Sequence, residues 1–146
     1  LYGSATRPSV LLLGMTRTQV RTCLGRASST SRATRTRPER WSYGRGLSIS
    51  FRSARVTEFT LNDGRFRTSR GGAGVGSPLR ALGQALPGMR RDARTRRQRA
   101  LVRRPDGRYA DVRIRVTGGK VRQVVVSLKA RSRLDAFGRS LLRRGT

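Results

Sequence analysis

The sequence contains no histidine and only one cysteine, Cys23. Ser-His-Asp and Cys-His catalytic arrangements are therefore excluded, and so is an ordinary zinc site, because each needs side chains that this chain lacks. A lone cysteine cannot form a disulfide within the chain. We expect no catalytic, metal-binding or cofactor-binding residues. The longest aliphatic run, residues 10–13, is far too short to span a membrane.

Acidic and aromatic residues are also scarce. Seven carboxylates stand against 34 lysines and arginines, which gives a net charge of +27 at pH 7, and aromatics make up 5% of the chain. Only Lys120 and Lys129 are lysines. A preference for arginine can reflect codon usage or bidentate recognition of phosphate and carboxylate groups. Codon usage does not explain the shortage of acids, so the charge points to an anionic partner.

Composition divides the 146 residues, which suffice for about one domain, into five segments. The glycine-rich segment before the second half lacks a following Gly-Lys-Ser/Thr, so we interpret it as a linker rather than a phosphate-binding loop. The segments are a flexible tail (1–9), a first α/β half (10–68), a Gly-rich linker (69–76), a second α/β half (77–130) and a C-terminal amphipathic helix (131–146).

Each half begins with a short predicted helix. Thr16 and Gln19 have the spacing of a capping box, and Gly25 ends the first helix. Cys23 falls on the apolar stripe of this helix, which favours a core residue over a reactive thiol. Ser77 and the following proline are typical of a helix start, so Ser77 is the predicted N-cap of the second helix.

Each half then continues into a predicted hairpin. Alternating residues predict strands at 47–51 and 56–61, and again at 112–116 and 121–128. The two hairpins match at a shift of 65 positions, which aligns Ile49 with Ile114, Phe51 with Val116, Arg55 with Lys120, Val56 with Val121 and Phe59 with Val124. We therefore predict an α+β fold of two tandem helix–loop–β-hairpin halves, with the helices packed on one face of an antiparallel sheet.

Two Arg-rich segments, 26–40 and 89–99, lie at equivalent places in the halves and are predicted to be loops. Trp41 and Tyr43 follow the first of them, where they either stack on unpaired bases or belong to the core. The predicted anion- or partner-binding residues are Arg32, Arg35, Arg37, Arg40, Trp41, Tyr43, Arg90, Arg91, Arg94, Arg96, Arg97, Arg99, Arg113 and Arg115.

The C-terminal segment has the spacing of another capping box, formed by Ser132 and Asp135. The helix it starts either docks on the domain or lies on a membrane surface, and docking is the favoured reading. Asp106 and Asp111 lie near one hairpin and form the one candidate carboxylate pair for an enzyme, the least favoured class of function.

Residues 14–20 (GMTRTQV), closed by Leu24 and Gly25, carry a family resemblance. They resemble the helix-start signature of the β-lactamase inhibitory proteins and of small outer-membrane assembly lipoproteins of the SmpA/OmlA kind. The resemblance implies an α+β unit, a secreted or cell-envelope location and a non-catalytic role in binding another protein. β-Lactamase inhibition is not carried over, because this chain lacks the disulfides and the acidic, aromatic binding face of those inhibitors.

These observations favour a non-enzymatic, strongly basic binding module of the cell envelope or secreted space. Its expected partner is an acidic protein or an anionic envelope polymer. The alternative is a nucleic-acid-binding protein that contacts phosphates through the Arg-rich loops without reading sequence.

Overall fold

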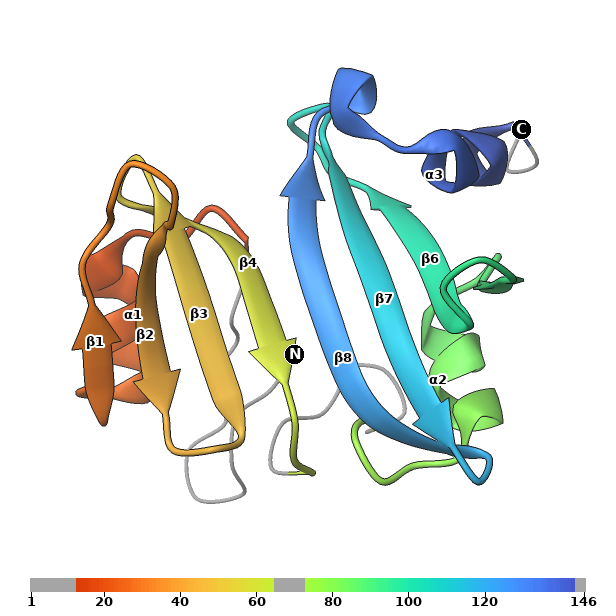
Figure 1. The fold of residues 1–146 in the computed structure, drawn as a ribbon, viewed down its shortest axis with the longest axis horizontal. Coiled ribbons are helices and arrows are strands. Elements are labelled where there is room, and N and C mark those ends of the chain that lie inside the picture. Colours follow the sequence, from red (N-terminus) through yellow and green to blue (C-terminus); the bar gives the residue numbers. More distant parts are fainter. Residues whose placement is uncertain (1–12, 65–72, 144–146) are drawn as a thin grey trace.

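The computed structural model describes residues 13–64 and 73–143, which form one eight-stranded antiparallel sheet with three α-helices (Figure 1). The predicted tail (1–9) and most of the predicted linker lie outside the described residues. In chain order the elements are α1 (Arg17–Leu24), β1 (Ser29–Ser31), β2 (Glu39–Tyr43), β3 (Leu47–Arg52), β4 (Arg55–Leu61), α2 (Leu79–Ala85), β5 (Arg90–Asp92), β6 (Arg97–Arg103), β7 (Tyr109–Thr117), β8 (Lys120–Lys129), a 3₁₀ turn (Arg131–Arg133) and α3 (Ala136–Leu142).

The predicted fold of two helix–loop–hairpin halves is wrong, because the fold is dominated by strands. Each half contributes four strands, and the sheet order is β1-β2-β3-β4-β8-β7-β6-β5. The segments predicted as basic loops contain the additional strands. β1 has all of its residues exposed, so it lacks the alternation of polar and apolar residues by which a strand is recognised in a sequence.

The two halves are related by an approximate two-fold axis through the middle of the sheet. In both hairpins the register shifts at the same place, between Ser50 and Phe51 and between Arg115 and Val116, which are 65 positions apart. β4 and β8 pair so that Thr60 lies opposite Val125, its own equivalent at that shift. The residue correspondence seen in the sequence is therefore present in the strand register, within a sheet that is continuous across both halves.

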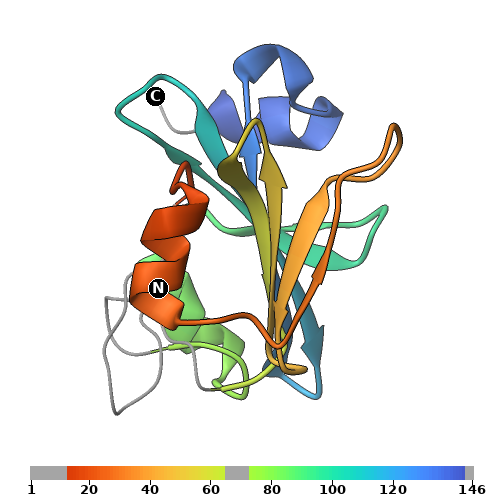
Figure 2. The same ribbon diagram turned by 90° about the vertical axis from the view of Figure 1, so that its left-hand side faces the viewer.

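One face of the sheet carries the apolar core, and α1 and α2 both cover that face (Figure 2). Each helix buries one aliphatic side chain there, Val20 from α1 and Leu82 from α2. In each half, an equivalent backbone hydrogen bond joins the segment before the helix to the hairpin. Gly14 N donates to Val56 O at 2.8 Å, and Gly76 N donates to Val121 O at 2.7 Å.

The helix ends confirm both predictions for the first helix, its capping box and its end at Gly25, and correct one prediction for each of the other two helices. Thr16 and Gln19 form the expected capping box. Ser77 is not an N-cap, because α2 starts one residue later, after Pro78, and the Ser77 hydroxyl instead accepts from Gly74 N at 3.1 Å. The third helix begins after Asp135, whose carboxylate accepts from Gly138 N, so Ser132 forms no capping box with it.

Candidate anion-binding site

The first Arg-rich segment forms one edge of the sheet, where β1 is the outermost described strand. A hollow of about 430 Å³ lies between β1 and the end of α1, with Trp41 forming part of its wall. Two arginines, Arg21 and Arg26, also line it, together with Ala27, Ser28, Ser29 and Thr30. We call this the first hollow.

A second hollow, of about 410 Å³, lies at the other end of β1. Its walls combine three arginines with short hydroxyl side chains, and both groups donate hydrogen bonds to carboxylate or phosphate oxygens. The lining residues are Ser31, Arg32, Thr34, Arg37, Pro38 and Arg40. The fold therefore gathers three of the predicted arginines, Arg32, Arg37 and Arg40, around one space.

The two hollows receive side chains from opposite faces of the sheet. Thr30 pairs with Trp41, and the next pair along is Ser31 with Arg40. Successive side chains of a strand point to opposite faces. Thr30 and Trp41 therefore contribute to the first hollow on the helix-covered face, while Ser31 and Arg40 contribute to the second hollow on the other face.

The second Arg-rich segment lies at the far edge of the sheet. Arg90 and Arg91 belong to β5, while Arg94 and Arg96 lie in the exposed turn before β6. Six strands separate β5 from β1, so the two edges lie about 30 Å apart at the usual strand spacing. The two basic segments therefore do not join into one surface.

Trp41 and Tyr43 belong to the core side of β2, so of the two predicted alternatives the core position is the one observed. Trp41 is 5% exposed, and its ring centroid lies 4.8 Å from that of Phe51. The Arg21 guanidinium lies over the Trp41 ring, 5.2 Å from the centroid. Tyr43 is half-buried and donates from its hydroxyl to Gly25 O at 3.0 Å. The Trp41 ring is therefore covered by Phe51 and Arg21, and the Tyr43 hydroxyl is held by the backbone.

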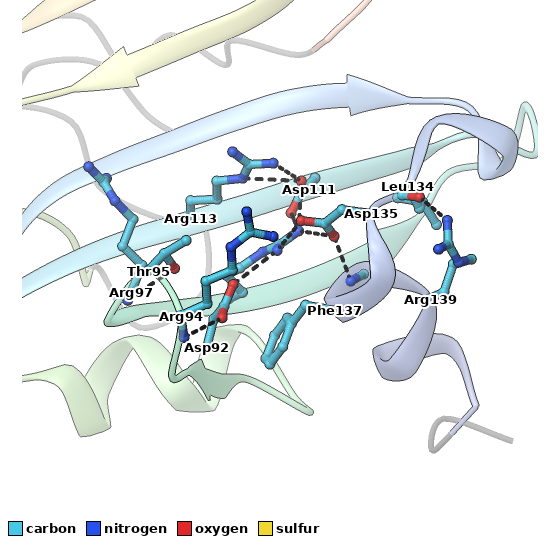
Figure 3. A network of polar contacts seen from close by, with 12 residues as sticks. Asp92, Arg94, Thr95, Arg97, Asp111, Arg113, Leu134, Asp135, Phe137 and Arg139 are labelled. Carbon is cyan, nitrogen blue, oxygen red and sulfur yellow. Dashed lines mark hydrogen bonds and ion pairs between the residues drawn. The ribbon is translucent and has the colours of Figure 1, made fainter.

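Arg99, a predicted partner-binding residue, is instead buried at 1% exposure within β6. It faces three carboxylates that come from separate parts of the chain. Nη1 lies 3.3 Å from Asp92 Oδ2 and 2.7 Å from Asp135 Oδ2, and Nη2 lies 3.2 Å from Asp111 Oδ2. Figure 3 shows Asp92, Asp111 and Asp135 converging on one point, with Phe137 beside them. We call these four charged residues the Arg99 cluster.

The pKa shifts of Arg99 and Asp135 favour the charged forms of both side chains. Burial lowers the pKa of Arg99, but the bonds and charges of Asp135 and Asp111 raise it by more. The hydrogen bonds from Arg99 hold the pKa of Asp135 at about 2, although burial opposes the shift. Arg99 is therefore paired with carboxylates of its own chain and is not available to an external anion.

The remaining predicted residues occupy the open face of β6 and β7 or exposed turns. Arg113 Nη2 lies 3.1 Å from Asp111 Oδ2, which ties it to the Arg99 cluster. Arg97 donates to Gln123 Oε1 at 3.2 Å. Arg115 is exposed in β7, and Arg35 is exposed in the turn between β1 and β2.

The proposed carboxylate pair is not formed. Asp106 lies in the turn before β7, where Arg108 Nη2 approaches it at 2.8 Å, and Asp111 is buried in the Arg99 cluster. Each carboxylate is therefore engaged by a different arginine. Within residues 13–64 and 73–143, no group of three metal-ligating side chains comes together.

Sequence reasoning missed Arg21 and Arg26 as site residues. It named Asp111 for a carboxylate pair and Asp135 for a capping box, but it did not connect these acids, or Asp92, with Arg99. Arg26 lay within the segment predicted to be a basic loop, so its composition was a signal for it. Arg21 lies on a helix, and only the packing of α1 over β2 brings it to the hollow. The acids had no local signal, because their partner is far away in the sequence.

Comparison with known proteins shows a likeness of fold. No protein-family model and no curated protein matches the sequence. One similar solved structure is that of an extracellular protein containing a SCP domain from Bacillus anthracis str. Ames, with a TM-score of 0.57 and 10% identity. The match covers 87% of this chain and 48% of that one, so the chain spans about half of its length.

That likeness concerns the fold alone, at so low an identity. The resemblance of residues 14–20 to inhibitory proteins and assembly lipoproteins stays a prediction. Among the helices that the structure describes, none is both long enough and apolar enough to cross a membrane.

Proposed function

We propose that this chain is a non-enzymatic module that binds an anionic partner, an acidic protein or an anionic polymer of the cell envelope or secreted space. One observation carries the proposal. Three of the seven carboxylates in the sequence converge on Arg99, and two of them, Asp92 and Asp111, are buried. The accessible surface therefore has a higher ratio of basic to acidic side chains than the whole sequence has.

The β1 edge is the best-shaped part of that surface. Two hollows lie side by side along the edge, and five arginines line them. Arginine presents a planar fork that matches a carboxylate or phosphate, and clustered charges of one sign attract an anion over about 8 Å at physiological salt. Envelope or secreted location is part of the proposal, and the extracellular nature of the structural neighbour is consistent with it.

Nucleic acid is less well supported as the partner. Because Trp41 and Tyr43 pack into the β2 side of the core, stacking on bases has no aromatic platform there. Binding would depend on phosphate contacts alone and would fall steeply with salt. Nucleic acid is therefore one arm of the test.

The test uses the full chain and fluorescent poly-glutamate, heparin and single-stranded DNA over a salt series. Replacing Arg32, Arg37 and Arg40 by serine is expected to weaken poly-glutamate binding by roughly tenfold, since three charge-assisted contacts of about 0.5 kcal/mol each are lost. The matched control replaces Arg103, Arg122 and Arg131, which are exposed elsewhere, and removes the same charge.

Two results would contradict the proposal. One is the absence of poly-glutamate and heparin binding at physiological salt. The other is a preference of tenfold or more for DNA over both other polymers under those conditions. An equal loss in the site variant and the control variant would contradict the assignment to the β1 edge.

A further inference from the structure

The sheet ends at β1 with a row of backbone groups that no other described strand covers. The strand runs from Ser29 to Ser31, pairs only with β2 among the described strands, and has all three residues exposed. An uncovered edge of this kind presents N–H and C=O groups at strand spacing and can pair with another extended chain.

The charge around β1 decides which chain can pair there. Arg21 and Arg26 line the hollow at one end of the strand, and Arg32, Arg37 and Arg40 line the hollow at the other. A second copy of this protein carries a net charge of +27 and would bring the same arginines against these. Like charges therefore oppose edge-to-edge self-association, and an acidic chain is favoured.

The geometry points to an extended acidic segment of another polypeptide, which we propose pairs with the β1 edge as a ninth strand. In an added strand, successive side chains point to opposite faces of the sheet. Because the first hollow lies on the helix-covered face and the second on the open face, neighbouring acidic residues of the partner would reach different hollows. The arrangement thus suits consecutive carboxylates on an extended backbone.

This inference rests on the proposed function and narrows it to one class of partner. Sulfated or phosphorylated polymers could satisfy the arginines, but they cannot supply alternating N–H and C=O groups to the strand. Strand pairing is therefore the property that separates an acidic polypeptide from the other anions.

The experiment compares two fluorescent octapeptides of identical charge, each with four consecutive glutamates. One has a normal backbone, and the other is N-methylated at alternate residues so that strand pairing is blocked. Fluorescence anisotropy is expected to show at least tenfold weaker binding of the methylated peptide. Hydrogen exchange is expected to show new protection of backbone amides in β1 only with the normal peptide.

Chain variants supply the second readout. Replacing Arg26 and Arg37 by serine, one from each hollow, is expected to weaken the normal peptide by several-fold. The matched variant of Arg103 and Arg122, which removes the same charge from β6 and β8 in the other half of the sheet, is expected to weaken it by less than twofold.

The outcomes separate the two proposals. Equal binding of both peptides without protection of β1 would overturn strand pairing and leave the anion-binding function standing. If neither the peptides nor poly-glutamate and heparin bind at physiological salt, both proposals fail.

Discussion

The two halves of this sheet share a strand register but fill the space under it differently. In the first half, Trp41 pairs with Ile49, and in the second half Gln98 occupies the corresponding position opposite Ile114. The hairpin positions Phe51 and Phe59 correspond to valines. The first half therefore uses large aromatic side chains on the helix-covered face, where the second uses smaller ones.

The opposite face shows the reverse contrast. Arg99 pairs with Arg113 in the second half, and the corresponding residue of the first half is Ser42, which pairs with Ser48. Only the second half, within the described residues, has a helix over this face, and α3 supplies Asp135 to the Arg99 cluster. At the positions that correspond to Arg99 and Arg113, the first half has the small polar residues Ser42 and Ser48.

The same strand register therefore holds arginine in two different environments, one in each half. In the second half, the carboxylates and α3 make a buried arginine part of the fold. In the first half, no described helix covers the open face, so Arg32, Arg37 and Arg40 remain available beside β1. The duplicated sheet thus separates a structural half from the half that we propose binds the partner.

The largest expected effect comes from breaking the Arg99 cluster. Replacing Arg99 by alanine leaves the buried carboxylates of Asp92 and Asp111 without their main counter-charge, and we expect a loss of about 3–5 kcal/mol in the free energy of unfolding. The control is Ser42→Ala at the corresponding position of the first half, where we expect less than about 1 kcal/mol. Urea unfolding measures the free energy of unfolding of both variants. Similar losses in the two would contradict the proposed difference between the halves.

The second largest effect is expected from the buried aromatic residues of the first half. Trp41→Ala removes a buried ring that contacts Phe51 and supports Arg21, and it should cost about 3 kcal/mol. Gln98→Ala, at the corresponding position, should cost about 1 kcal/mol or less. Thermal unfolding followed by far-UV circular dichroism tests this, and a Gln98 effect as large as that of Trp41 would disprove it.

The equivalent hairpin turns offer a smaller test with opposite signs. Ser53 and Ala54 have φ angles of 50° and 62°, and the matching Gly118 and Gly119 have 61° and 75°. A positive φ angle costs a residue with a Cβ about 1 kcal/mol. Glycine avoids this strain but loses more conformational entropy on folding, which offsets part of the gain. We expect Ser53→Gly with Ala54→Gly to stabilise the protein by about 1 kcal/mol, and Gly118→Ser with Gly119→Ala to destabilise it by about 1–2 kcal/mol.

Both turn variants are measured by denaturant unfolding under the same conditions. Changes of the same sign in the two variants would mean that the turns are not equivalent in energy.

The smallest effect concerns acid. The folded-state pKa of Asp135 is about 2, below its ordinary 3.8, because Arg99 donates hydrogen bonds to its carboxylate. A lowered folded pKa contributes stability that is fully present above the ordinary value and is lost as the pH falls through about 2. The hydrogen-exchange protection factors of the α3 amides should therefore fall between about pH 4 and pH 2 by more than those of the α1 amides.

Asp135→Asn is the matched variant for this prediction. In this variant the α3 amides should already exchange faster at neutral pH. No further loss of their protection should then occur between about pH 4 and pH 2. Fluorescence of Trp41, the only tryptophan, reports on the first half and should not follow this loss of protection. Parallel changes in α1 and α3 would show that acid unfolds the sheet as a whole.

Much of the local structure could be predicted from the sequence. The capping box at Thr16, the alternation around Ile49 and Ile114 and the turn residues between paired strands all act over a few residues. The edge strands could not be predicted in this way, because an exposed strand has no apolar face to produce alternation. The structure places Arg32, Arg37 and Arg40 around one hollow, but buries Arg99 among carboxylates and Trp41 in the core, and the binding roles of the exposed arginines stay predictions.

What the sequence determined by itself was the balance of charge, the paired hairpins and the start of the first helix, since composition and short-range spacing carry them. Only the tertiary structure decided that the hairpins join through β4 and β8 and that Arg99 meets acids 7, 12 and 36 positions away. The reason is physical: an arginine side chain is compatible with solvent and with a buried ring of carboxylates. Which of these it occupies depends on what the folded chain places around it.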